Sequence, residues 1–360
     1  MPNAILQPNQ QLILKPKSQF YAGPYETRVL SVDGTRAVLE TPYDQGKLIL
    51  LSAGTNLEVT DGTENLRFNS QVIERSFQGS PSITISVPLD IPVIKRAKVI
   101  SVTSGKGGVG KTSVTINLAI TLAQQGLKVF VIDADLGTAN VDVLLDVQPR
   151  FNLNHVVKGE KDILDIVIEA PGGINLVPGG SGFQFLADLD TEQLRHVISS
   201  YKQLESYADV ILIDTGAGLS KNVINFALAS DEVLVVTNTE PHAITDAYAI
   251  IKVLSEYEEM PLCSLIVNRA ETPLEGQQVG KRMSNVAQRF LGMELELLGY
   301  ILDDRTVSKA IKQKKPHILT FPNAPFAQGI KSVAQKITKG DKAQTKKKSF
   351  FDRLKDIFVS

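Results

Sequence analysis

The alternation of apolar and polar positions separates the chain into parts with different patterns. From Gln11 to about Pro92, apolar residues recur at every second position in short runs, and turn residues such as Asp33-Gly34, Asp61-Gly62 and Gly79 separate the runs. This period-two pattern predicts β-strands. We expect strands at Gln11–Leu14, Arg28–Val32, Ala37–Glu40, Lys47–Leu51, Asn56–Val59, Phe68–Ile73 and Ser82–Val87, folded as a small antiparallel barrel or sandwich.

Residues 98–338 follow a second pattern, in which continuous apolar runs alternate with amphipathic helical segments. One helix is expected to end near Gly126, and another, from about Thr191, places Leu194, Val197 and Tyr201 on one face. Fully apolar strands separated by helices predict an α/β fold with a parallel sheet covered on both faces. The first expected strand begins at Lys98. The others lie at Lys128–Asp133, Ile174–Val177, Val210–Asp214, Glu232–Thr237, Leu262–Asn268 and Leu297–Ile301.

The last residues have a pattern of their own. Residues 339–348 form a polar, lysine-rich linker, and residues 349–360 place Phe350, Phe351, Leu354, Ile357 and Phe358 on one helical face. An aromatic apolar face beside lysines suits an anionic membrane surface, and packing back onto the core is the alternative. We therefore divide the chain into a β domain (1–94), an α/β domain (95–338), a basic linker (339–348) and an amphipathic helix (349–360).

Composition narrows the functional classes. The chain has 360 residues, 43% of them hydrophobic, which is ample for a sizeable core, and its net charge of −1 gives no general attraction to nucleic acid. Its one cysteine, Cys263, excludes a disulfide framework and a cysteine-based metal cluster. The N-terminus lacks a signal-peptide pattern, and no run of about 18 apolar residues occurs. We expect a cytoplasmic protein that needs no nucleic acid.

A glycine-rich loop between the first α/β strand and its helix carries the strongest chemical signal. It reads Gly105-Lys106-Gly107-Gly108-Val109-Gly110-Lys111-Thr112, which satisfies the phosphate-binding pattern G-x-x-x-x-G-K-[ST]. The glycines let backbone N–H groups turn towards an anion at a helix N-terminus. Lys111 can reach the β- and γ-phosphates, the Thr112 hydroxyl can ligate Mg²⁺, and Ser113 extends the polar helix start. The loop predicts binding of a nucleotide with Mg²⁺.

Carboxylates follow two of the predicted strands, where ligands bind in open α/β sheets. Asp133 and Asp135 end one strand at i, i+2 and point the same way, so that one can support Mg²⁺ or the phosphate-binding loop and the other can orient the attacking water. Asp214 ends the apolar run Val210–Ile213 and matches a Walker-B aspartate, which makes it a candidate catalytic residue and metal ligand. Helix capping by Asp133 or Asp135 is the alternative.

The second lysine of the loop, Lys106, resembles the signature residue of the MinD/ParA ATPases, whose deviant Walker-A loop reads KGGxxGK[ST]. The resemblance implies a P-loop NTPase fold and an ATP-bound homodimer in which Lys106 crosses to the partner's phosphates. It also implies that Asp135 is catalytic and that Asn268, followed by Arg269, binds adenine. The alternatives are a solvated loop lysine at 106 and a turn asparagine at 268.

Within this family, three segments are most similar to the FlhG branch, which sets flagellar number and position: Asp133–Asp142, Val177–Gly182 and Thr239–Tyr248. The resemblance implies a switch that hydrolyses ATP slowly and acts at the inner face of the membrane with flagellar partners such as the GTPase FlhF. The N-terminal helix with a DQAxxLR-like motif, through which many FlhG proteins act on FlhF, is absent. The competing classes are a division-site or partition ATPase and a non-hydrolysing adaptor.

The spacing of Gly23-Pro24-Tyr25, Arg28-Val29, Thr41-Pro42, Gly46 and Gly54 in the β domain resembles the N-terminal domain of YcgR-type flagellar brake proteins. Those proteins bind cyclic di-GMP through an arginine-rich linker and a following PilZ domain. Here the linker Ile94–Lys98 runs straight into the ATPase domain, so we do not expect cyclic di-GMP binding. We expect a protein-interaction module, with passive packing as the alternative.

Overall fold

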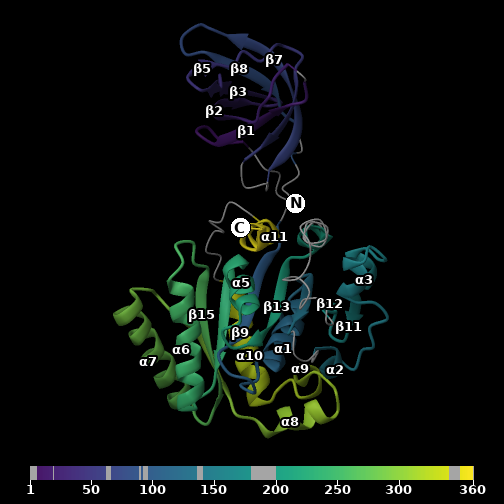
Figure 1. The fold of residues 1–360 in the computed structure, drawn as a ribbon, viewed down its shortest axis with the longest axis vertical. Coiled ribbons are helices and arrows are strands. Elements are labelled where there is room, and N and C mark those ends of the chain that lie inside the picture. The colour runs from purple at the N-terminus through teal and green to yellow at the C-terminus, as the bar shows by residue number, and fades with distance from the viewer. Residues whose placement is uncertain are drawn as a thin grey trace. The chain divides into compact units, whose positions relative to one another are not determined.

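The computed structural model describes residues 6–18, 20–61, 66–88, 91, 96–135, 141–179, 200–339 and 349–359. The chain forms two compact units: residues 1–96 with 345–349, and residues 97–344 with 350–360. Figure 1 shows the fold of both units.

The first unit is a closed antiparallel barrel with strand order β1-β2-β3-β8-β7-β6, closed by pairing of β6 with β1. Alternate residues of each strand are buried, as in β2, and they meet in one apolar core. Of the two predicted arrangements, barrel and sandwich, the barrel is therefore the one that forms. Its strands are β1 (Gln11–Pro16), β2 (Tyr25–Asp33), β3 (Arg36–Glu40), β6 (Asn56–Thr60), β7 (Arg67–Ser76) and β8 (Ser82–Ser86).

One predicted barrel strand lies outside the barrel. Only residues 47 and 48 of the predicted strand Lys47–Leu51 are extended, as β5 (Lys47–Leu48), and they pair with β4 (Tyr43–Asp44) in a separate hairpin. Gln45 and Gly46 both have positive φ, which is the backbone of a type I′ hairpin turn. The prediction failed because Leu48 and Leu50 are exposed, and apolar residues alone do not show which side of a strand reaches the core.

The second unit is built on an eight-stranded sheet with order β11-β12-β10-β13-β9-β14-β15-β16. Every predicted α/β strand is present. The short edge strand β11 was not predicted, and it pairs antiparallel with β12. The strands are β9 (Lys98–Ser104), β10 (Val129–Ala134), β11 (Ile168–Ala170), β12 (Ile174–Val177), β13 (Val210–Ala217), β14 (Glu232–Thr237), β15 (Leu262–Ala270) and β16 (Glu296–Leu302).

Helices cover both faces of this sheet (Figure 1). Ile100 and Val102 of β9 pack in one apolar cluster with α1 and α10, whereas Val99 packs in the opposite layer, which includes α5. The predicted P-loop NTPase fold is confirmed. The helices are α1 (Lys111–Gln124), α2 (Val141–Leu145), α3 (Leu153–Val157), α5 (Lys221–Ala229), α6 (Pro241–Ser255), α7 (Pro273–Leu291), α8 (Arg305–Lys312), α9 (His317–Thr320), α10 (Pro325–Lys339) and α11 (Phe350–Val359), with a 3₁₀ turn η1 (Ile163–Ile166).

The C-terminal helix α11 packs against α5 with the apolar face that the sequence predicts (Figure 1). Phe350, Phe351 and Leu354 are almost fully buried, and Phe351 stacks on Tyr201. The Arg353 guanidinium donates to the Ala229 carbonyl at 2.7 Å and pairs with Asp231 at 2.7 Å. In this structure the apolar face of α11 is therefore packed against the α/β unit and is not exposed.

The helix predicted from about Thr191 falls mainly on residues outside the described ranges. Residues 200–207 are helical, with Tyr201 buried as predicted. Among the described helices, we found none with the length and apolar content needed to cross a membrane.

Candidate nucleotide-binding site

The phosphate-binding loop connects the carboxyl end of β9 to α1. Gly108 and Gly110 have φ values of 84° and 93°, in the left-handed region that favours glycine. A Cβ on Gly110 would also lie 2.4 Å from the Asn268 Nδ2 atom. Lys111 is the first residue of α1, so the loop's backbone N–H groups and the helix N-terminus lie at one place. The loop and the helix start therefore meet where the anion cradle is predicted, and its binding of phosphate stays a prediction.

Lys111 is buried in this site and is paired with Asp214. Its Nζ atom lies 2.9 Å from Asp214 Oδ1, which also accepts a hydrogen bond from the Thr115 hydroxyl at 2.8 Å. Asp214 is fully buried, and its Oδ2 atom has no hydrogen-bond partner among the described residues. A buried carboxylate oxygen without a partner is costly unless another group, such as a metal-bound water, satisfies it.

Asp133 lies directly beside Asp214, because the two residues are paired in register on the parallel strands β10 and β13. Burial, and then the negative charge of Asp214, raises the pKa of Asp133 to about 7. The backbone N–H of Asp135 donates to Asp133 at 3.2 Å. A divalent cation would relieve the repulsion between these carboxylates, so Asp133 and Asp214, with half-buried Thr112 in the first turn of α1, fit the predicted Mg²⁺ set.

Asp135, the predicted catalytic residue, is half-buried at the end of β10. A Cβ on Gly216 would lie 3.6 Å from the Asp135 Oδ1 atom, so this carboxylate lies beside the segment that follows Asp214. The structure thus brings both strand ends together. The role of Asp135 in orienting water stays a prediction. Residues 136–140 of the same motif lie outside the described residues.

Asn268 contacts the loop directly, which the sequence did not predict. Its Nδ2 atom donates to the Val109 carbonyl at 2.8 Å, while its buried Oδ1 atom has no partner among the described residues. The free oxygen can still accept from an adenine amino group, so the predicted role in base binding stays open. Arg269 has a left-handed φ of 56°, and its guanidinium donates to the Gly108 carbonyl at 3.4 Å. Both residues therefore also hold the loop in place.

Lys106 lies at the exposed rim of the loop and forms an ion pair with Glu240 at 3.1 Å. The hydrogen bond and the charge of Lys106 keep the pKa of Glu240 below its usual value. Sequence reasoning missed Glu240. The available signal was its position just after the predicted strand Glu232–Thr237, at the same sheet edge as the other site residues.

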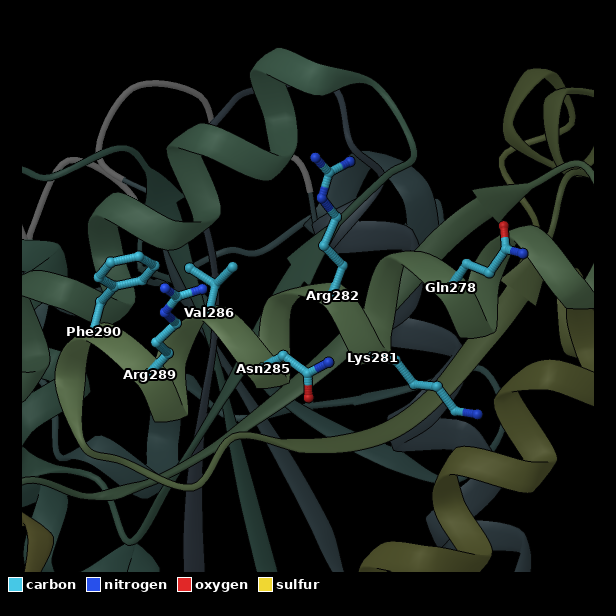
Figure 2. Close-up of a pocket in the computed structure, with 7 residues that line it drawn as sticks. All are labelled: Gln278, Lys281, Arg282, Asn285, Val286, Arg289 and Phe290. Atoms are coloured by element: carbon cyan, nitrogen blue, oxygen red, sulfur yellow. The ribbon is translucent and has the colours of Figure 1, made fainter.

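A second feature lies on α7, where residues 276–293 contain three basic residues and no Asp or Glu. Figure 2 shows Lys281, Arg282 and Arg289 projecting from the helix along a shallow recess of about 400 Å³. Phe290 is 66% exposed, and the Arg289 guanidinium lies 5.4 Å from the centre of its ring. We call these four residues the α7 surface.

Comparisons with known proteins match both units. A family model described as an AAA domain matches residues 97–264, and one described as flagellar protein YcgR matches residues 7–88. The chain is 40% identical over 240 residues to the antiactivator FleN of Pseudomonas aeruginosa, covering 67% of this chain and 86% of FleN. It is 37% identical over 264 residues to the flagellum site-determining protein YlxH of Helicobacter pylori, covering 71% of this chain and 89% of YlxH.

Among solved structures, the chain is similar to the septum site-determining protein MinD complexed with Mg-ADP from Pyrococcus horikoshii OT3. The TM-score is 0.56 at 28% sequence identity, and the match covers 69% of this chain and 99% of that one. The matched protein holds the nucleotide and the metal for which the present site has a fitting set of residues.

Proposed function

The chain belongs to the MinD/ParA family of P-loop ATPases, in the branch of FleN and YlxH, and from this membership we propose that it is an ATP-driven dimerising switch that controls flagellar number or placement. The proposal rests on the arrangement of Lys111, Asp133 and Asp214 at one place. They lie beside a loop that also contains Lys106, the signature lysine of the family. ATP and Mg²⁺ are the ligands that this set of residues suits.

The proposed chemistry is hydrolysis of the γ-phosphate. The loop amides and Lys111 would bind the phosphates, while Thr112, Asp133 and Asp214 would hold Mg²⁺, which would supply charge neutralisation at the phosphates. Asp135 orients the attacking water from its position beside Gly216. Lys106 serves the partner's nucleotide in the dimer, which makes ATP the condition for dimerisation.

We place the membrane contact of this switch at α11. Its apolar side chains are buried in the monomer, so contact with lipid requires the helix to leave its position on α5. Burying each large apolar side chain is worth about 1.5–3 kcal/mol, and lipid would bury the same groups. The apolar contributions to docking and to membrane insertion therefore nearly cancel. Two tails presented by one dimer would then favour the membrane through avidity.

We infer that the α7 surface binds an acidic segment of a flagellar partner protein. The three cations without an interspersed carboxylate favour an acidic partner, and the exposed Phe290 offers an apolar anchor at one end. A nucleic acid is less suited, because three charges neutralise few phosphates and the whole chain is slightly acidic. The similarity of residues 7–88 to flagellar protein YcgR supports a flagellar setting.

The test is to count flagella in cells that lack the protein and in cells complemented with the wild type or with Lys111→Ala. We expect an altered number or position of flagella that only the wild type restores. Minicells with normal flagella would instead support a division-site function. Full complementation by Lys111→Ala would support a non-hydrolysing adaptor.

A further inference from the structure

Glu240 and Lys106 meet at the rim of the nucleotide site, and we propose that Glu240 is a positioning residue that restrains the lysine. It holds the Lys106 ammonium within its own subunit until the nucleotide of a partner subunit takes it over. The inference rests on the proposed dimer. Beyond that dimer, it assigns to Glu240 an effect on how tightly the ATP-bound chain dimerises.

The ion pair is built on two adjacent strands. Lys106 follows β9 and Glu240 follows β14, and these strands pair in parallel, with Val235 opposite Thr103. The Asn238 side chain accepts the backbone N–H of Glu240 at 3.0 Å, and Pro241 then begins α6. The backbone of Glu240, which carries this carboxylate, is therefore held in place by a hydrogen bond and by the start of α6.

The backbones on both sides of the pair are in direct contact. A Cβ on Gly105 would lie 2.2 Å from the backbone carbonyl of Asp246 on α6, so the start of the loop is pressed against that helix. No side chain larger than that of glycine fits at this contact. Transfer of Lys106 from Glu240 to another anion is thus a movement of side chains, with the loop and α6 staying together.

The pair is open to competition. The side chains of Lys106 and Glu240 are 43% and 57% exposed, so a partner's phosphates can reach the ammonium, and an exposed pair is weak. A triphosphate carries more negative charge than one carboxylate. It therefore replaces Glu240 as the partner of Lys106 once a nucleotide-bound subunit is near. A weak restraint of this kind shifts dimerisation by a few fold and disfavours dimers that lack a γ-phosphate.

The first experiment measures the contact in the nucleotide-free monomer. Acetylation of Lys106 by acetic anhydride is followed by mass spectrometry in the wild type, in Glu240→Gln and in the control Glu256→Gln. Glu256 is exposed at the other end of α6 and undergoes the same loss of charge. We expect Lys106 to react about twofold to fivefold faster in Glu240→Gln only, which matches the strength of an exposed pair. Equal rates in all three proteins would overturn the proposal.

The second experiment measures the dimer dissociation constant with ATP by analytical ultracentrifugation, with Lys106→Ala included. We expect Glu240→Gln to dimerise about twofold to fivefold more tightly than the wild type, with a smaller difference at high salt. If Lys106→Ala dimerises normally, the proposed contact of Lys106 with the partner's phosphates is wrong, whatever the labelling shows. If Lys106→Ala prevents dimerisation but Glu240→Gln dimerises like the wild type or more weakly, only the role of Glu240 is wrong.

Discussion

Lys111 and Asp214 form a buried ion pair, with 2.9 Å between Nζ and Oδ1, at the point where the phosphate-binding loop meets the end of β13. The lysine that would bind phosphate is therefore already directed into the site by the carboxylate that would support the metal. Because both groups are removed from water, the pair positions the lysine firmly.

The pH dependence of metal binding follows from the neighbours Asp133 and Asp214. The pKa of Asp133 is about 7 in the folded chain, above the ordinary value of 3.8. Mg²⁺ needs the ionised carboxylate, so we expect Mg²⁺ affinity of the nucleotide complex to rise as the pH increases through about 7. In the nucleotide-free protein the same group lowers stability as pH rises from about 4 to 7, because the folded state binds the proton more tightly.

Isothermal titration across pH 5.5–8.5 and urea unfolding would check both effects. Asp133→Asn should flatten the stability slope in that window. An unchanged slope would show that Asp133 does not titrate there.

Replacement of Asp135 tests the proposed water-orienting role. Asp135→Ala should bind ATP and accumulate as the ATP-bound dimer, while hydrolysis falls by about tenfold to a thousandfold, the scale of losing one positioning group. Phosphate release and size-exclusion chromatography with ATP give the two readouts. Wild-type turnover in this variant would move the role to another residue, with Asp214 the next candidate.

Asn268 has two candidate roles, and nucleotide choice separates them. Asn268→Ala removes the hydrogen bond to the Val109 carbonyl and the free Oδ1 atom together. A lost buried hydrogen bond of about 1–3 kcal/mol corresponds to a loss in affinity of roughly fivefold to 150-fold. We expect ATP affinity to fall more than GTP affinity, measured by competition with a fluorescent nucleotide. An equal fall for both nucleotides would mean that Asn268 only fastens the loop.

The docking of α11 depends on Arg353, which is buried against Asp231 and the Ala229 carbonyl. Removing one partner of a buried pair costs on the order of 3 kcal/mol, so Arg353→Ala should release the helix and raise binding of the ADP form to anionic vesicles. The control Asp352→Asn breaks the half-exposed pair with Lys202 and should change little.

Co-sedimentation with vesicles, with and without ATP, is the measurement for α11. Phe351→Glu should abolish vesicle binding in every nucleotide state, because it places a charge on the apolar face. If Arg353→Ala and the wild type sediment alike with ADP, the contacts of Arg353 do not restrain the helix.

The α7 surface is tested by a charge reversal. Arg282→Glu should reduce capture of flagellar proteins by the purified chain without changing ATP turnover, because Arg282 is exposed on α7 and is not one of the residues of the nucleotide site. Lys312→Glu, an equivalent reversal at an exposed lysine of α8, should capture the same proteins as the wild type. Equal capture by both variants would show that the partner binds elsewhere.

Most of the secondary-structure elements and the core of the site could be predicted from local sequence patterns. The period-two runs and the continuous apolar strands follow from local burial, and the phosphate-binding loop needs only neighbouring residues. Even the meeting of Asp133 and Asp214 was predictable, because the carboxyl ends of parallel strands lie at one edge of a sheet.

The long-range partners of the side chains depend on how the whole unit packs. Lys106 pairs with Glu240 across 134 positions, and Asn268 holds Val109 across 159 positions. No local pattern encodes such contacts. The apolar face of α11 was predicted from its spacing, but spacing shows only that a face avoids water. Lipid and protein satisfy that face equally well, and only the packing of Phe350 and Phe351 beside α5 shows which one covers it in this monomer.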